Sequence, residues 1–326
     1  MLLAGDIGGT KTVLALYSLV GGTLGLVHSE RFPSGSAATL EEIVLQFLHA
    51  KGNPHVTAAC FGVAGAVVGG QVRATNLPWH VSEAGLAREL GIRRVHLLND
   101  LEAAAHGVIA IADRSSLHTL QSGDPPDGHR SLTLVAAGTG LGVAVMSWVG
   151  DRYQVAPSEG GHIDFAPQDE VEDALLLWLR ARFGRVSYER VVSGPGLANV
   201  YRFLREYRNI AEPKWLTDRI GDDDPAPVIA AAALSGEDAV CDETLTRFVS
   251  IYGAAAGNFA LTALAVGGVF IGGGIAPKIL PRLQAGRFLE SFAAKGRFRD
   301  WMRRIPVQVV LAPDVALLGA ASCVAD

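Results

Sequence analysis

Near its N-terminus the chain reads Gly5-Asp6-Ile7-Gly8-Gly9-Thr10-Lys11-Thr12, a glycine-rich turn expected between two strands. Glycine lets main-chain N–H groups come close to phosphate oxygens, and the Thr10 hydroxyl can donate a further hydrogen bond. The Asp6 carboxylate would repel phosphate unless a divalent cation lay between them, which implies Mg²⁺ held at Asp6 through water. We therefore expect residues 6–11, including Ile7, to bind a magnesium nucleotide. Lys11 either meets phosphate charge or lies at the rim of the site.

Two more glycine clusters follow along the chain. Gly138-Thr139-Gly140 lies between two apolar runs, as the first turn does, and Ala15 and Ala144 stand at matching offsets after the two Gly-Thr pairs. Gly272-Gly273-Gly274 follows an apolar strand and precedes a helix expected near Pro277, where an adenine or ribose could lie against bare backbone. Each cluster alone could be an ordinary tight turn. The three together indicate an ATP site.

Size and composition bound the class of protein. With 326 residues the chain exceeds one comfortable hydrophobic core, which favours two domains. Its 28 Lys and Arg against 33 Asp and Glu leave no broad basic face, so neither nucleic acid nor an anionic membrane is an expected partner. Glycines break both long uncharged runs and no basic leader is present, so we expect neither a membrane span nor a signal peptide. The isolated Cys60, Cys241 and Cys323 indicate free thiols in a reducing, cytoplasmic compartment.

The hydrophobic periodicity predicts an α/β fold. Short β-branched runs are expected to be strands, and longer amphipathic segments between them are expected to be helices. The expected strands are the N-terminal run and residues 13–17, 57–63, 94–98, 132–136, 142–148, 269–271 and 306–311. The expected helices are residues 39–50, 101–112, 170–183, 197–207 and 242–265.

Longer blocks that fix polar residues at set spacing carry a family resemblance. They are Asn99-Asp100, Ser158-Glu159-Gly160-Gly161-His162-Ile163-Asp164-Phe165, Ser187-Tyr188-Glu189-Arg190-Val191-Val192-Ser193-Gly194-Pro195-Gly196, and Gly296-Arg297-Phe298. Together with the three glycine clusters they resemble, over essentially the whole length, the bacterial glucokinase family of the actin, sugar-kinase and heat-shock-chaperone superfamily.

The resemblance implies a particular architecture. It is an α/β, two-domain actin-like ATPase fold of the ribonuclease H-like kind, with a deep interdomain cleft. The small domain would comprise residues 1–112 plus 303–326, and the large domain residues 113–302. The final helix, 313–325, would pack closely through Gly319-Ala320-Ala321. A homodimer is also expected.

Asn99 and Asp100 follow the strand at 94–98 and precede a helix. Open α/β sheets present ligand-binding residues at such strand ends. The resemblance makes Asp100 the catalytic base and assigns the neighbouring sugar hydroxyls to Asn99. An aspartate suits this role, since phosphoryl transfer needs one group to orient the attacking hydroxyl and accept its proton. The alternative for Asp100 is a helix N-cap.

The resemblance assigns further sugar contacts to Glu159, His162 and Glu189. Carboxylates and an imidazole around a ring of hydroxyls can discriminate epimers, because a wrong epimer leaves buried groups unpaired. His162 could instead be a core histidine, or form a metal pair with Glu159. Glu189 could instead form a surface ion pair with Arg190. A cysteine-rich zinc site is not expected, since no cysteine lies between Cys60 and Cys241.

The resemblance implies a glucokinase that transfers the γ-phosphoryl group of MgATP to the 6-hydroxyl of glucose, giving glucose 6-phosphate and ADP in the first step of glycolysis. A kinase for another hexose or an amino sugar on the same scaffold is the nearest alternative. A sugar-sensing transcription regulator would need a basic helix-turn-helix ahead of the first turn, which already begins at Gly5. A chaperone-like or filament ATPase gives no reason for Asn99-Asp100 together with Glu159 and His162.

Overall fold

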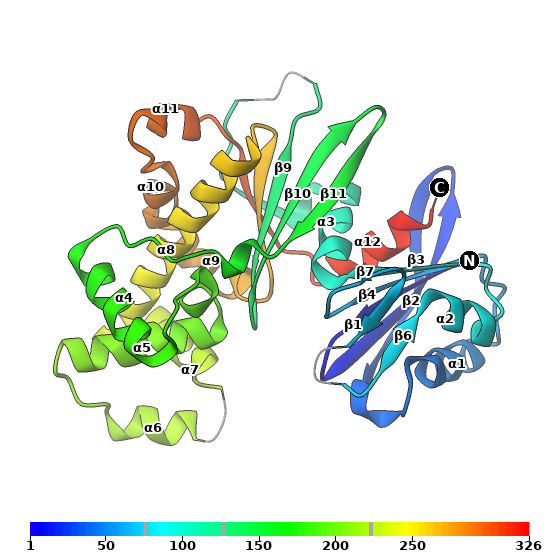
Figure 1. The fold of residues 1–326 in the computed structure, drawn as a ribbon, viewed down its shortest axis with the longest axis horizontal. Helices are drawn as coiled ribbons and strands as arrows, with labels where there is room; N and C mark the ends of the chain where they lie inside the picture. Colours follow the sequence, from blue (N-terminus) through cyan, green and yellow to red (C-terminus); the bar gives the residue numbers. More distant parts are fainter. Residues whose placement is uncertain (75–76, 125–127, 222–223, 326) are drawn as a thin grey trace. The chain divides into compact units, whose positions relative to one another are not determined.

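The computed structural model describes residues 1–74, 77–124, 128–221 and 224–325, and the chain divides into two compact units (Figure 1). The first unit comprises Met1–Arg114, Val155–Pro157 and Ala312–Asp326, and the second comprises Ser115–Gln154 and Ser158–Leu311. The chain returns to the first unit at Ala312 and not at the expected residue 303. The reason is that strand β13 (Val307–Val310) is hydrogen-bonded on both sides within the second unit's sheet.

The first unit is built on a five-stranded sheet in the order β3-β2-β1-β4-β7. Strands β1, β2 and β3 form an antiparallel meander, and β4 and β7 extend it in parallel. A separate small hairpin joins β5 and β6. The strands are β1 (Leu2–Ile7), β2 (Lys11–Val20), β3 (Thr23–Pro33), β4 (Ala58–Val63), β5 (Gln71–Arg73), β6 (His80–Ser82) and β7 (Arg94–Asn99).

Helices cover both faces of this sheet because its strands are apolar on both sides. Leu3 and Ile7 of β1 pack with the apolar faces of α1 (Leu40–Ala50) and α2 (Glu83–Leu90). Leu2 and Ala4, on the opposite face, pack with α3 (Asp100–Ala110) and α12 (Val315–Cys323). The side chains of a strand alternate between faces, so one short segment supports two cores. The short 3-10 turn η1 (Ser34–Ser36) follows β3, and the 3-10 turn η2 (Arg114–Ser116) lies where the chain passes into the second unit.

Helices α3 and α12 approach each other through glycines. A Cβ at Gly319 would overlap the carbonyl oxygen of Ala103, and a Cβ at Gly107 would overlap that of Val315. This confirms the close packing expected from the small residues of the final helix. It also holds the start of α3, where Asp100 lies, against the sheet.

The second unit contains a six-stranded sheet in the order β11-β10-β9-β12-β13-β8. Strand β9 pairs antiparallel with β10 and parallel with β12, β12 runs parallel to β13, and β13 is antiparallel to β8. The remaining strands are β8 (Leu117–Gln121), β9 (Leu132–Ala137), β10 (Leu141–Val149), β11 (Arg152–Ser158) and β12 (Gly268–Gly272).

The helices of the second unit include the long helix α8, most of whose residues are buried (Figure 1). They are α4 (Glu170–Phe183), α5 (Gly194–Tyr207), α6 (Lys214–Ile220), α7 (Pro225–Ser235), α8 (Ala239–Ala263), α9 (Leu280–Gln284), α10 (Arg287–Ala293) and α11 (Arg299–Met302). Short 3-10 turns occur at η3 (Gly160–His162), η4 (Tyr188–Arg190), η5 (Ala276–Ile279) and η6 (Gly296–Phe298).

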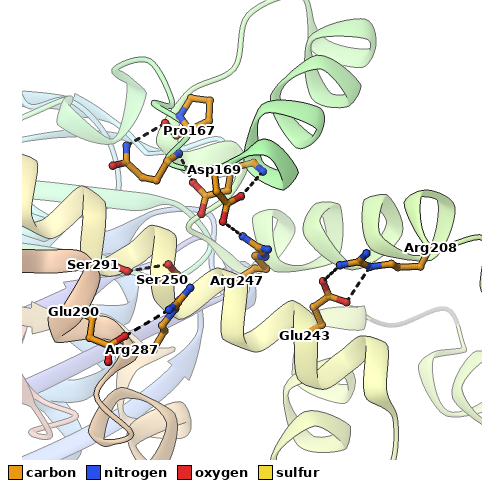
Figure 2. A network of polar contacts seen from close by, with 11 residues as sticks. Pro167, Asp169, Arg208, Glu243, Arg247, Ser250, Arg287, Glu290 and Ser291 are labelled. Atoms are coloured by element: carbon orange, nitrogen blue, oxygen red, sulfur yellow. Dashed lines mark hydrogen bonds and ion pairs between the residues drawn. The ribbon is translucent and has the colours of Figure 1, made fainter. Parts of the chain in front are cut away.

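Polar side chains connect helices α4, α8 and α10 of the second unit. Asp169 caps α4 by accepting the N–H of Glu172 at 3.0 Å, and it also pairs with Arg247 of α8 (Figure 2). On α8 and α10 the hydroxyls of Ser250 and Ser291 lie 2.8 Å apart (Figure 2). Capping satisfies N–H groups that a helix start would otherwise leave unpaired.

The expected strands and helices are confirmed, with shifts of a few residues at their ends. The helix expected near Pro277 differs, since it begins as the 3-10 turn η5 before the short helix α9. Strand β3 was not expected, because it is an edge strand whose side chains are mostly exposed and follow no apolar alternation. Among the described residues, no helix is long and apolar enough to cross a bilayer.

Candidate active site

The first glycine turn joins β1 to β2, as expected. We call Gly8–Lys11 the first phosphate turn. The Gly8 N–H donates to the Lys11 carbonyl at 2.9 Å and closes the turn, while Thr10 and Lys11 are exposed at its tip. A phosphate group could therefore reach the Thr10 hydroxyl and the backbone at the tip of the turn.

Asp6 lies just before this turn in an acidic setting. Burial raises the pKa of the Asp6 carboxyl, the Lys11 charge lowers it, and the Asp100 and Asp314 carboxylates raise it again, with a net increase. The Asp100 and Asp314 carboxylates are therefore close enough to Asp6 to act on its charge, and Lys11 opposes them. This arrangement favours a cation, and oxygen ligands are those that Mg²⁺ prefers.

Asn99 ends β7 and caps helix α3, so Asp100 is the first residue of the helix. The Asn99 side-chain oxygen accepts the Leu101 N–H at 2.9 Å, and its side-chain nitrogen donates to the Gly65 carbonyl at 3.0 Å. The N-cap residue of α3 is therefore Asn99, and not Asp100 as the alternative interpretation had it. The amide of Asn99 retains one N–H that is not used in these two contacts, since an amide nitrogen carries two.

Glu102 completes a capping box at this helix start. Burial raises the pKa of the Glu102 carboxyl, while the hydrogen bond from the Asn99 backbone N–H opposes that increase. The Asn99 side chain accepts the Leu101 N–H, and the Glu102 side chain accepts the Asn99 N–H. Two N–H groups that would otherwise be unpaired at the helix start are thus satisfied. It also holds Asp100, which stands exposed between them, in one backbone conformation.

The second unit brings together the three residues expected to contact the sugar. His162 Nε2 lies 3.8 Å from Glu159 Oε2, and His162 Nδ1 lies 3.9 Å from Glu189 Oε1. Glu159 directly precedes η3, His162 is its last residue, and Glu189 lies in η4. We call Glu159, His162 and Glu189 the acid–histidine cluster. It presents acceptors on both sides of a ring that can donate or accept.

Glycines allow this cluster to form. Gly161 lies directly on the backbone of Leu141, whose carbonyl oxygen a Cβ at this position would overlap. The Ser158 hydroxyl donates to the Val143 carbonyl at 3.0 Å and accepts the Gly160 N–H at 3.2 Å. The turn that carries Glu159 and His162 is therefore tied to strand β10.

Two of the alternatives for these side chains do not hold. His162 is not a core histidine, since 55% of its side chain is exposed. Glu189 contacts His162 and the backbone of Leu141, whereas the Arg190 guanidinium lies 4.2 Å from the centre of the Phe183 ring. The surface ion pair considered for Glu189 is thus replaced by contacts that point toward the glycine turn.

The second glycine turn, Gly138–Gly140, joins β9 to β10 and is held from three directions. We call it the second phosphate turn. Within the turn, the Gly138 N–H donates to the Gly140 carbonyl at 2.9 Å. From outside it, the Gly194 N–H donates to the Gly138 carbonyl at 2.8 Å. Glu189 Oε2 accepts the Leu141 N–H at 3.0 Å, and a Cβ at Gly140 would lie 2.5 Å from that oxygen. Thr139 is exposed at the tip.

The third cluster, Gly272–Gly274, follows β12 beside the end of β9. Gly273 has a φ of 80° and lies against Ala137, so a Cβ there would overlap the Ala137 backbone. The buried Tyr252 hydroxyl lies 2.9 Å from the Val135 carbonyl and 3.4 Å from the Gly272 carbonyl. Helix α8 therefore anchors both strand ends, and the second and third clusters share one edge of the sheet.

Sequence reasoning missed the residues that support these loops. Glu102 was detectable, because Asn99-x-x-Glu102 has the spacing of a capping box. Tyr252 and Asp314 had no local signal, since their partners lie far away in the sequence.

Known structures identify the class of protein. A crystal structure of glucokinase from an Antarctic psychrotroph superposes with a TM-score of 0.87 at 32% identity, covering 99% of this chain and 98% of that chain. A ROK family glucokinase from Streptomyces griseus, solved in complex with glucose and AMPPNP, shares the fold with a TM-score of 0.64 at 21% identity, covering 99% and 98% of the two chains. The fold is that of the actin-like ATPase sugar kinases.

Sequence comparisons narrow the assignment. A family model described as Glucokinase matches residues 3–326. The glucokinase of Nostoc punctiforme is 42% identical over 339 residues, covering 100% of this chain and 99% of the relative. The chain belongs to the glucokinase family and is an ATP-dependent sugar kinase of that family.

Proposed function

We propose that the chain transfers the γ-phosphoryl group of MgATP to the 6-hydroxyl of glucose, with Asp100 as the base. The observation that carries the proposal is the contact between Glu189 and Leu141, which joins the acid–histidine cluster to the second phosphate turn at 3.0 Å. A polyhydroxyl acceptor held by that cluster would therefore lie beside a phosphate held by that turn. Glucose and AMPPNP in the Streptomyces griseus relative support the choice of ligands.

The first unit supplies the base and one sugar contact. Asp100 is exposed at the start of α3, so its carboxylate can align a sugar hydroxyl and accept its proton as the O–P bond forms. Asn99 offers its remaining N–H to a neighbouring hydroxyl. The capping box formed with Glu102 keeps both residues in place, which lowers the entropic cost of orientation.

We propose that the three glycine clusters bind the nucleotide. Asp6 to Lys11, Gly138, Thr139 and Gly272–Gly274 contact ATP, with phosphates at the two phosphate turns and the adenosine at the third cluster. Asp6 would hold Mg²⁺ through water, as its acidic surroundings favour. When bound, the metal ion neutralises negative charge on the phosphates.

The acid–histidine cluster provides sugar specificity. Carboxylates of Glu159 and Glu189 accept hydrogen bonds from hydroxyls, and the His162 ring donates or accepts according to its tautomer. An epimer with one hydroxyl misplaced would leave one of these groups unpaired. We propose glucose as the preferred sugar on this basis and from the family.

The two units correspond, in our proposal, to a small and a large domain, and the protein acts as a cytoplasmic homodimer. The division of the chain into two compact units supports the domain assignment. Size-exclusion chromatography with light scattering tests the dimer, for which a mass near twice 34.3 kDa is expected.

A coupled assay for glucose 6-phosphate tests the proposed reaction. Product should form with glucose and MgATP together, and neither substrate alone should suffice. Asp100→Asn should lower kcat about 10²–10⁴-fold with the KM for glucose within a few fold, because the amide keeps the shape but cannot take a proton. Asp151→Asn, at an exposed turn, is the matched control. An Asp100→Asn enzyme as active as its parent would remove Asp100 from this role.

A further inference from the structure

Ser34 is a fully buried serine that contacts the first phosphate turn with both its backbone and its side chain. It begins η1, directly after β3, and its exposed fraction is 0%. Its hydroxyl donates to the Gly8 carbonyl at 2.7 Å, and its backbone N–H donates to the Thr10 carbonyl at 3.0 Å. One residue, distant along the chain, therefore holds two of the turn's carbonyl groups.

A second buried hydroxyl extends this contact. Thr12 Oγ1 lies 3.0 Å from Ser34 Oγ, and Thr12 is also 0% exposed. Because the Gly8 carbonyl can only accept, the single hydroxyl proton of Ser34 is committed to it. Thr12 must then donate to Ser34, which gives a directed chain from Thr12 through Ser34 to Gly8. Such chains polarise their members and strengthen each bond.

The direction of these carbonyls determines the direction of the neighbouring N–H groups. In a planar trans peptide the C=O of one residue and the N–H of the next point in opposite directions. With the Gly8 and Thr10 carbonyls turned toward Ser34, the N–H groups of Gly9 and Lys11 are turned away from it. Backbone N–H groups oriented in this way form an anion-binding surface.

We propose that Ser34 is a positioning residue for catalysis, which orients the Gly9 and Lys11 N–H groups toward a phosphate of ATP. The inference rests on the proposed binding of phosphate at this turn. Ser34 is fully buried, so it would act on the nucleotide through the backbone of the turn. Its loss would leave the Gly8 carbonyl without this donor and let the peptide rotate, so nucleotide affinity should fall while sugar affinity is preserved.

Ser34→Ala tests the proposal against Ser36→Ala as the matched control. Ser36 lies two residues away in the same 3-10 turn, is exposed, and donates only to the Pro33 carbonyl at 2.6 Å. Ser34→Ala should raise the KM for ATP and the Kd for Mg-AMPPNP about 10-fold, the scale of one lost buried hydrogen bond, with the KM for glucose within 2-fold. Ser36→Ala should change neither constant.

Thr12 provides a second route that does not alter Ser34. Thr12→Val removes the donor to Ser34 at nearly constant shape, whereas Thr12→Ser keeps it. A rise of about 3-fold in the Kd for Mg-AMPPNP is expected for Val, with rescue by Ser. If Ser34→Ala and Thr12→Val both fold and leave nucleotide affinity unchanged, or weaken glucose and nucleotide equally, the inference is overturned.

Thr10→Val separates this inference from the function on which it rests. Thr10 lies at the exposed tip of the same turn. If Thr10→Val weakens Mg-AMPPNP binding and Ser34→Ala does not, the turn binds phosphate and only the role of Ser34 is wrong. If neither variant changes the affinity, the phosphate site itself is misplaced.

Discussion

The Oε2 oxygen of Glu189 lies 3.0 Å from the backbone nitrogen of Leu141, which precedes it by 48 residues. The other oxygen of the same carboxylate lies 3.9 Å from His162 Nδ1. A single side chain thus contacts the acid–histidine cluster and the second phosphate turn. Within the second unit, the proposed sugar contacts and the proposed phosphate turn therefore share one carboxylate.

Substitutions of Glu189 should separate these two roles. Glu189→Gln keeps an oxygen that can accept the Leu141 N–H, whereas Glu189→Ala leaves that N–H unpaired. Both variants should raise the KM for glucose about 10-fold or more, but only Ala should also raise the KM for ATP, by about 5-fold. Steady-state kinetics with each substrate varied in turn measures both constants. Equal effects of Gln and Ala on the KM for ATP would contradict a role for this hydrogen bond.

Glu159→Ala should relax the choice of sugar. Glu159 is 86% exposed and approaches only His162 within the cluster, so its removal should not disturb the fold. The KM for glucose should rise about 10-fold, and the ratio of kcat/KM for glucose over its epimers should fall. Asp164→Ala, which removes an exposed acid paired with Arg185, serves as the control. An unchanged specificity profile across a panel of hexoses would argue against the assignment.

The ion pair of Asp238 and Arg205 should make stability depend on acid pH. Burial raises the pKa of Asp238, but hydrogen bonds from Arg205 and the Cys241 N–H outweigh it and hold the pKa below its ordinary value of 3.8. A depressed folded-state pKa means that this stabilisation is present above pH 3.8 and is lost as the pH falls through the folded value.

Asp238→Asn should remove this dependence. The amide can still cap α8, where Asp238 accepts the Cys241 N–H at 2.8 Å, but the Arg205 charge loses a partner at 2.7 Å in a largely buried site. The free energy of unfolding at pH 7 should fall by about 3 kcal/mol, measured by urea denaturation. Between pH 5 and 3 the variant should lose less further stability than the parent. Glu237→Gln, at an exposed ion pair, should change little.

Gly319→Ala should destabilise the first unit. The added Cβ would overlap the Ala103 carbonyl oxygen, so α12 must move away from α3. Overpacking of this kind costs about 1–3 kcal/mol, and kcat should fall as well because α3 carries Asp100. Gly35→Ala is the control, since a Cβ there meets no atom within 4 Å. A Gly319→Ala protein as stable as its parent would show that the helices separate without cost.

Much of the fold could be predicted because its signals are local. The apolar strand 94–98 followed by a helix placed Asn99 and Asp100 at a strand end, and the glycine turns were expected between strands. Strand β3 escaped prediction because an exposed edge strand needs no apolar face. The boundary at Ala312 escaped it because pairing of β13 with its neighbours is a long-range property.

The residues of the candidate site could also be predicted only in part. The sequence, read with its family resemblance, determined which groups are candidates for the chemistry: a carboxylate after a strand, glycine turns, and Glu159, His162 and Glu189 in ordered blocks. Only the tertiary structure decided what holds them. Ser34 orients the first phosphate turn, Tyr252 anchors β9 and β12, and Glu189 secures Leu141, because hydrogen bonds depend on atoms a few ångströms apart in space whatever their separation along the chain.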